Sequence, residues 1–160
     1  MYKFLFYFIF FTIVEIQVLA QNVVDDSVLF VLDLNVEDKS VKITPLTESD
    51  FWFLDSTVTR IVEIKDFNAD NKEDALIYLG ACGSGGCMYG VFFKQHKNFY
   101  KLVFMDYLKT PVFNKEDNGY ISLTSYEEVE PYNPSEIYVT KYVFDEKIFQ
   151  YTKDTTYIAK

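Results

Sequence analysis

Apolar and polar residues alternate in short segments along most of the chain, and turn-forming residues separate these segments. A period of two is typical of strands that bury one face of a sheet. The pattern predicts an all-β fold, a mostly antiparallel meander that forms a sandwich or a partly closed barrel. The expected strands are residues 27–35, 40–44, 59–65, 75–79, 88–94, 99–105, 120–125, 137–144, 148–152 and 157–158.

The segments between these strands differ in character. Residues 37–39 and 145–147 have the composition of tight turns, and the polar, proline-bounded residues 127–134 predict a surface loop. Residues 47–56 fit two structures, a capped helical turn or an aromatic loop that packs over the sheet. No repeat of 20 to 50 residues is present, which argues against a complete propeller or solenoid.

The N-terminal residues have a different pattern from the rest of the chain. Lys3 is followed by an almost entirely apolar and aromatic run over residues 4–14, and small or apolar residues precede Gln21. This order predicts a secretory signal peptide, residues 1–20, with cleavage after Ala20. The remaining chain, residues 21–160, fits a single all-β domain.

Two other N-terminal assignments fit less well. A membrane anchor needs about 20 apolar residues, and Glu15 interrupts the run. A lipoprotein needs a cysteine after the cleavage point, where the chain has Gln21. We therefore expect export to the periplasm or the extracellular space, with no membrane span after cleavage.

The composition narrows the choice of partner. Aromatic residues make up 19% of the chain, which favours strands, and the formal net charge is −9. Nucleic-acid phosphates require a basic face, and anionic lipid surfaces attract basic segments. The charge therefore argues against both kinds of partner.

The chain contains two cysteines, Cys82 and Cys87, in the sequence Cys-Gly-Ser-Gly-Gly-Cys. In an exported protein such a pair predicts a disulfide. Zinc is a poor alternative because it needs two more ligands, and the chain has a single histidine, His96. The expected disulfide closes a hairpin between the strands on either side.

An acidic turn, residues 66–74, carries oxygen-bearing side chains at its first, third, fifth and ninth positions. These side chains are Asp66, Asn68, Asp70 and Asp74. Calcium takes six to eight oxygen ligands, and close carboxylates repel one another unless a cation lies between them. The alternative is an Asx-rich surface turn without metal.

The flanking sequence decides which kind of calcium turn is expected. A helix–loop–helix site closes with glutamate at position twelve, where this chain has Ile77. With strands on both sides, the acidic turn resembles the calcium turn of integrin-type FG-GAP and VCBS repeats, Asp-x-Asn-x-Asp-Gly-x-x-Asp. The resemblance covers residues 62–76, and the Cys-Gly-x-Gly-Gly-Cys hairpin is similar to that of short secreted proteins with such a turn.

The resemblance implies one calcium ion and a set of ligands. The ligands are the side chains of Asp66, Asn68, Asp70 and Asp74 and the backbone carbonyl of Lys72. The chain departs from the family pattern at the sixth position, where Asn71 replaces glycine. Asparagine tolerates the left-handed backbone that this position needs. The repeats normally form arrays, whereas this chain has one copy.

No catalytic centre is evident in the sequence. His96 lies in a polar turn where a solvated side chain is expected, and no Gly-x-Ser-x-Gly nucleophile motif is present. Paired carboxylates for sugar hydrolysis remain an alternative. One acidic segment with flanking tyrosines has the composition of a sugar or protein contact surface, or of a solvated loop. Its residues are Tyr126, Glu127, Glu128, Glu130 and Tyr132.

The function that these features predict is a secreted, calcium-stabilised, non-enzymatic binding or structural module with a protein or glycan partner. Two alternatives come from other classes. One is an extracellular hydrolase that uses carboxylates, and the other is an exported inhibitor or immunity protein.

Overall fold

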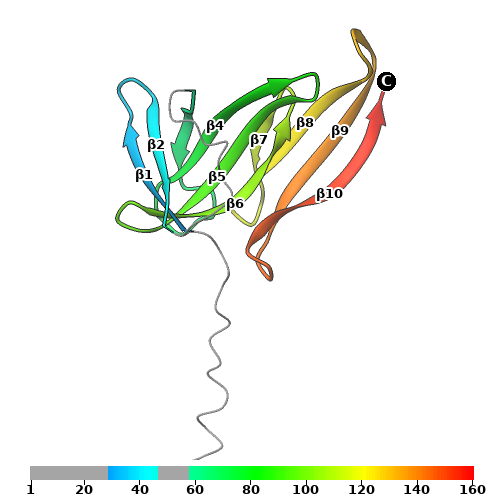
Figure 1. The fold of residues 1–160 in the computed structure, drawn as a ribbon. Coiled ribbons are helices and arrows are strands. Elements are labelled where there is room, and N and C mark those ends of the chain that lie inside the picture. Colours follow the sequence, from blue (N-terminus) through cyan, green and yellow to red (C-terminus); the bar gives the residue numbers. More distant parts are fainter. Residues whose placement is uncertain (1–28, 47–57) are drawn as a thin grey trace, which may run out of the picture.

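The computed structural model describes residues 29–46 and 58–160, which form ten strands in two antiparallel sheets (Figure 1). These residues contain no helix, and so none that is long and apolar enough to cross a membrane. The all-β, antiparallel prediction is confirmed. The predicted signal peptide and the two structures considered for residues 47–56 lie outside the described residues. The strands are β1 (Leu29–Asn35), β2 (Ser40–Pro45), β3 (Arg60–Lys65), β4 (Asp74–Gly83), β5 (Gly86–His96), β6 (Phe99–Leu108), β7 (Val112–Lys115), β8 (Ile121–Glu130), β9 (Asn133–Asp145) and β10 (Gln150–Ala159).

The first sheet contains β1 to β6 in chain order and curls until β6 pairs again with β1. The curl is only partly ring-like, because β2 and β3 share the single pair Ser40–Arg60. Its interior is filled by apolar side chains that we call the ring core. These are Phe30, Leu32, Val41, Ile43, Ile61, Ala75, Ile77, Leu79, Phe92 and Tyr100.

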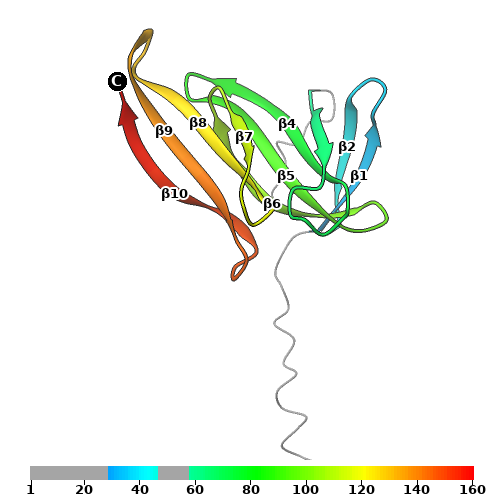
Figure 2. The same ribbon diagram turned by 180° about the vertical axis from the view of Figure 1, so that it is seen from behind.

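The second sheet has the strand order β10-β9-β8-β7 and packs against the outer side of β4 to β6 (Figures 1 and 2). The apolar side chains between the two sheets form a second core, which we call the sandwich core. Its buried members are Phe67, Leu76, Val91, Phe93, Val103, Phe104, Leu108, Ile121, Leu123, Tyr142, Phe144 and Tyr151.

Strand β4 belongs to both cores because successive side chains point to opposite faces of a strand. Ala75 and Ile77 face the ring core, whereas Leu76 between them faces the sandwich core. All three side chains are fully buried. This double burial explains why residues 75–79 are continuously apolar and do not alternate.

Residues 127–134 lie at the surface as predicted, but the prediction that they form a loop is wrong. Strand β8 continues to Glu130 and β9 begins at Asn133, so the connection is the two-residue turn Pro131–Tyr132. Proline suits the first central position of a type II turn, and the second requires positive φ, which Tyr132 adopts at 65°. The two prolines therefore mark a tight turn and a strand start, not a loop.

Two further differences concern the second sheet. The short strand β7 was not predicted, since its four residues are too few to show a period. The two segments expected at residues 148–152 and 157–158 belong to one strand, β10, which begins only at Gln150 and has a register shift between Lys153 and Thr155. A bulge of this kind interrupts the alternation that a sequence pattern relies on.

Candidate functional site

The acidic turn joins the end of β3 to the first residue of β4, as its predicted position between two strands requires. Its backbone takes positive φ twice, 63° at Ala69 and 62° at Asn71. The expectation that Asn71 accepts a left-handed backbone is confirmed. Ala69 does the same without the polar side chain that eases this conformation in asparagine, and its left-handed backbone was not predicted.

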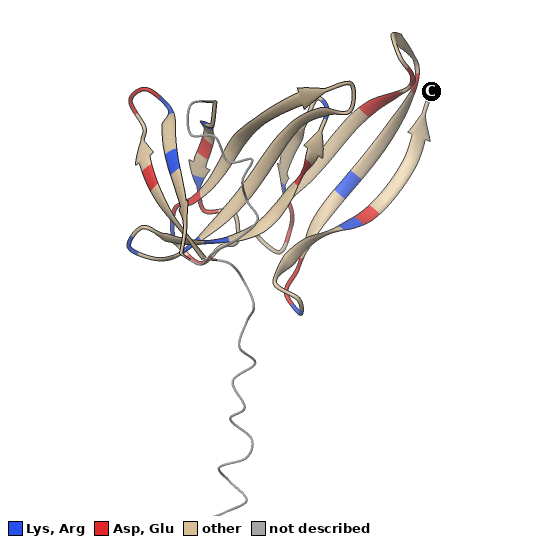
Figure 3. Cartoon of the chain, viewed as in Figure 1, with Lys and Arg blue, Asp and Glu red and all other residues tan. Residues whose placement is uncertain are grey.

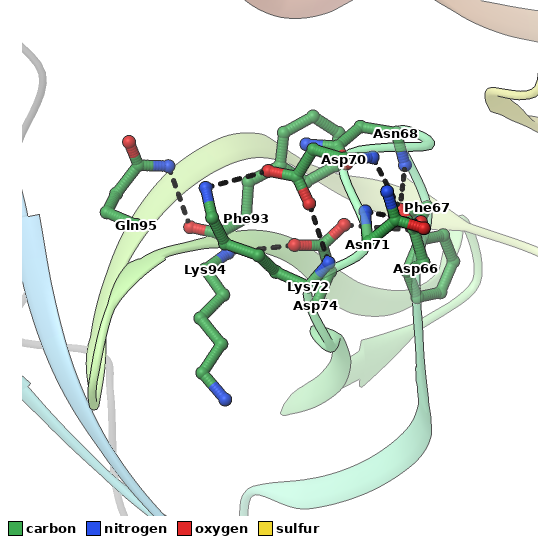
Figure 4. Close-up of polar contacts among 10 residues, drawn as sticks. All are labelled: Asp66, Phe67, Asn68, Asp70, Asn71, Lys72, Asp74, Phe93, Lys94 and Gln95. Atoms are coloured by element: carbon green, nitrogen blue, oxygen red, sulfur yellow. Dashed lines mark hydrogen bonds and ion pairs between the residues drawn. The ribbon is translucent and has the colours of Figure 1, made fainter.

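The carboxylate of Asp66 lies at the centre of the turn (Figure 4). It accepts backbone N–H bonds from Asn68 at 3.2 Å, Asp70 at 3.2 Å and Asn71 at 2.9 Å. The side-chain oxygen of Asn68 accepts a further N–H bond from Asp70 at 3.1 Å. The turn thus wraps its backbone around two of the predicted ligands, and these are also the bonds expected of an Asx-rich turn.

Asp70 is held by Lys72 through two bonds. The backbone N–H of Lys72 donates to one carboxylate oxygen at 2.9 Å, and Lys72 Nζ donates to the other at 3.0 Å. Burial raises the pKa of Asp70, but the bonds from Lys72 outweigh it and the pKa is lowered overall. Asp70 is therefore ionised at neutral pH.

Asp74 is fully buried and connects the acidic turn to β5 (Figure 4). Its carboxylate accepts N–H bonds from Phe67 at 2.9 Å and from Lys94 at 2.8 Å. Burial raises the pKa of Asp74 to about 7, with smaller contributions from the charges of Asp70 and Asp66 and against the two N–H groups. Within residues 29–46 and 58–160, no lysine or arginine forms an ion pair with Asp74.

A buried hydroxyl lies within electrostatic range of this carboxylate. Tyr151 packs against Phe93 and Phe104 in the sandwich core, and its Oη has no hydrogen-bond partner among the described residues. Burial raises the pKa of Tyr151, and the charge of Asp74 adds to this. An unsatisfied buried hydroxyl is costly, and this one lies near a carboxylate that has hydrogen bonds but no ion-pair partner among the described residues.

The acidic turn offers oxygen ligands, which are the ligands that a hard cation such as calcium binds. Four oxygen-bearing side chains lie in one turn, and each carboxylate has about four lone-pair directions, more than the N–H bonds use. The described part of the chain has no three His, Cys, Asp or Glu side chains gathered as a metal cluster. The carboxylates also accept backbone N–H bonds, and the lone pairs that these bonds do not use are the ones a cation would take.

Three residues around the turn were not anticipated from the sequence. Phe67 and Lys94 contribute backbone N–H groups, and Tyr151 approaches from the last strand. Of these three, only Phe67 could have been singled out from the sequence, because it is a large apolar residue inside a mostly polar turn. It is fully buried in the sandwich core.

The predicted disulfide between Cys82 and Cys87 is confirmed, with an S–S distance of 2.11 Å. It closes the hairpin of β4 and β5, so the acidic turn and the disulfide lie at opposite ends of β4. Gly86 in this hairpin has φ of 106°, and a Cβ there would lie 2.3 Å from the carbonyl oxygen of Leu108. Only glycine fits this close approach.

Replacing both Cys82 and Cys87 with serine is expected to lower the free energy of unfolding by about 2 kcal/mol. The effect is modest because the disulfide closes a short loop and constrains the unfolded chain little. Urea unfolding of the oxidised protein and of the double variant measures the difference, and the reduced wild type should match the variant. Equal midpoints for all three samples would contradict this expectation.

The predicted contact residues are distributed over the two faces of β8 and the tip of the hairpin that follows it. Tyr126 and Glu128 lie on the face of β8 opposite to Glu127, because they alternate along the strand. Lys109 forms an ion pair with Glu128. Tyr132 lies apart at the tip of the hairpin and is 100% exposed.

The other polar features show no concentrated site. His96 ends β5 with an exposed side chain, as expected for a solvated histidine. Lys and Arg lie scattered among Asp and Glu over the described chain (Figure 3).

Comparison with known proteins adds no further assignment. No family model matches the chain, and neither the curated proteins nor the solved structures that were searched include a match.

Proposed function

We propose that this protein is an exported, non-enzymatic binding module that one calcium ion stabilises at the acidic turn. The ligands are the side chains of Asp66, Asn68, Asp70 and Asp74 and the carbonyl of Lys72. When bound, the ion supplies positive charge between the carboxylates and has no part in a reaction. The resemblance to FG-GAP and VCBS calcium turns motivates this assignment.

The observation that carries the proposal is the fully buried carboxylate of Asp74. It lies close enough to Asp70 and Asp66 for their charges to raise its pKa, and no cationic side chain among the described residues pairs with it. A buried charge is costly unless it is paired or coordinates a metal. A divalent cation in the turn would attract all three carboxylates and offset two of their three negative charges.

Calcium is expected to bind the chain from residue 21 onward with a Kd of about 10⁻⁴–10⁻³ M, the range of extracellular sites. At a calcium concentration of about ten times Kd, mass action stabilises the fold by about 1.4 kcal/mol. This raises Tm by about 3–6 °C for a domain of this size. Calorimetric titration measures the Kd, and thermal unfolding in calcium and in EDTA measures the shift.

Two variants sharpen this test. Asp66→Asn keeps an oxygen acceptor for the backbone N–H groups but removes a charge, and should abolish most of the Tm shift. Lys72→Ala keeps the backbone carbonyl and removes the competing ion pair with Asp70, so it should bind calcium at least as tightly as the wild type. Absence of a heat of binding at millimolar calcium, with identical Tm values in calcium and EDTA, would contradict the proposal.

Export is supported by the disulfide, because disulfides persist in oxidising compartments. The binding role is supported by the hairpin of β8 and β9, whose tip presents a wholly exposed tyrosine. Tyrosine is enriched where proteins meet partners. A protein or glycan partner that contacts this tip fits both observations.

The exposed tip also favours the second candidate, an exported inhibitor that places a hairpin in a partner's cleft. Tyr132 holds a left-handed φ that a bulky residue rarely adopts. Capture from the native extracellular fraction should give one stoichiometric partner with the wild type and none with Tyr132→Ala. Loss of the partner's enzymatic activity on binding selects the inhibitor, and unchanged activity selects the binding module.

A further inference from the structure

The acidic turn contacts the turn between β7 and β8. The backbone N–H of Ile121, the first residue of β8, donates to the carbonyl of Phe67 at 3.0 Å. A Cβ on Gly119 would lie 3.0 Å from the Cβ of Ala69, so the two turns meet at van der Waals distance. The charge of Asp70 also contributes to the raised pKa of Tyr120, where burial is the largest cause. Contacts thus join the two turns at several points.

Phe67 links the proposed calcium ligands to this contact. It lies between the ligands Asp66 and Asn68 in sequence, and its N–H donates to Asp74 at 2.9 Å. Its carbonyl accepts the bond from Ile121, and its ring is fully buried in the sandwich core. A backbone rotation that changes the ligand geometry therefore also moves the Phe67 ring and carbonyl.

The β7–β8 turn forms one wall of an open cleft of about 390 Å³. Its lining includes Glu116, Asp117, Asn118 and Tyr120 from the turn, and Phe144 from β9. Tyr120 stacks on Phe144 with ring centroids 4.9 Å apart. The shape of this cleft depends on where the turn is held.

We propose that calcium at the acidic turn controls the order of the β7–β8 turn, residues 116–120, through the contact of Phe67 with Ile121. This inference rests on the proposed calcium site. Bound calcium fixes the backbone of residues 66–68 and holds the Phe67 carbonyl on the N–H of Ile121. Without calcium this bond opens locally, and the cleft wall becomes mobile while both cores remain packed. The calcium site therefore regulates a surface of the second sheet.

Amide hydrogen exchange in the full exported chain tests the proposal. Calcium at ten times Kd should slow exchange of the Ile121 amide by about tenfold or more relative to EDTA, because local opening is suppressed. Two control amides report on the remainder of the fold. They are Leu32, which donates to the Asn98 carbonyl at 3.0 Å, and Tyr126, which donates to the Lys109 carbonyl at 2.8 Å. Both should change less than Ile121.

The outcomes separate this inference from the calcium site itself. Heat of calcium binding together with an Ile121 effect larger than both controls supports the inference. Heat of binding with unchanged Ile121 exchange, or with equal slowing at all three amides, overturns it and leaves the calcium site intact. Absence of heat overturns the calcium site. In Asp66→Asn, the selective slowing of Ile121 should disappear while the Leu32 and Tyr126 amides keep their protection in EDTA.

Discussion

Replacing Phe67 with alanine is expected to lower the free energy of unfolding by about 3–5 kcal/mol, the usual cost of removing a buried phenylalanine. Its ring is fully buried in the sandwich core although the residue belongs to a polar turn. The deletion leaves a cavity between the two sheets and frees the backbone that joins two proposed ligands. Urea unfolding in EDTA measures the loss without any contribution from calcium.

Tyr132→Ala is the matched control for this substitution. It also removes an aromatic ring, but from a wholly exposed position, and should change stability by less than about 0.5 kcal/mol. A cost for Phe67→Ala as small as that of the control would show that the ring does not support the sandwich core.

The second large effect concerns pH. In EDTA, the free energy of unfolding should fall by about 2–3 kcal/mol between pH 5 and pH 8. Asp74 has its pKa raised from 3.8 to about 7 in the folded protein, chiefly by burial. The folded state then keeps a proton that the unfolded chain has released. The protonated Asp74 carboxyl therefore makes its full contribution to the free energy of unfolding below pH 3.8. This contribution is lost as the pH rises through about 7.

The carboxyl groups whose pKa is lowered do not mask this slope. Hydrogen bonds lower the pKa of Asp38 and Glu116, so their contributions vary at pH values below the window. Asp74→Asn, which cannot titrate, should flatten the slope between pH 5 and pH 8, although it lowers stability at every pH. Urea titrations at four pH values measure both proteins, and a wild-type stability that rises or stays constant with pH would contradict the assignment.

Local patterns predicted the strands well where one face is buried and the other is exposed. The acidic turn, the left-handed Asn71 and the cysteine hairpin were also predictable, because each depends on residues close together in sequence. Residues 127–134 were misassigned because proline and glutamate suggest a loop when counted by composition. In the structure Pro131 and Tyr132 form a two-residue turn, and the other residues of this segment belong to the long strands β8 and β9.

The surroundings of the candidate site depend on long-range pairing, which a single sequence does not show. Lys94 reaches Asp74 because β5 pairs with β4, and Tyr151 approaches because the last strand packs on the first sheet. The return of β6 to β1 is likewise a contact between distant segments. None of these contacts has a periodic or spacing signal, so only the three-dimensional arrangement reveals which groups surround the turn.

The double burial of β4 limits how this protein can evolve. Most strands of an antiparallel sheet can accept polar substitutions on their outer face, but residues 75–77 have no outer face to vary. A deletion of one residue there would exchange the side chains of the two cores, because a one-residue slip turns every side chain to the other face. Sequence drift is therefore expected to be slowest in this segment, and length changes in diverged copies should be confined to the turns.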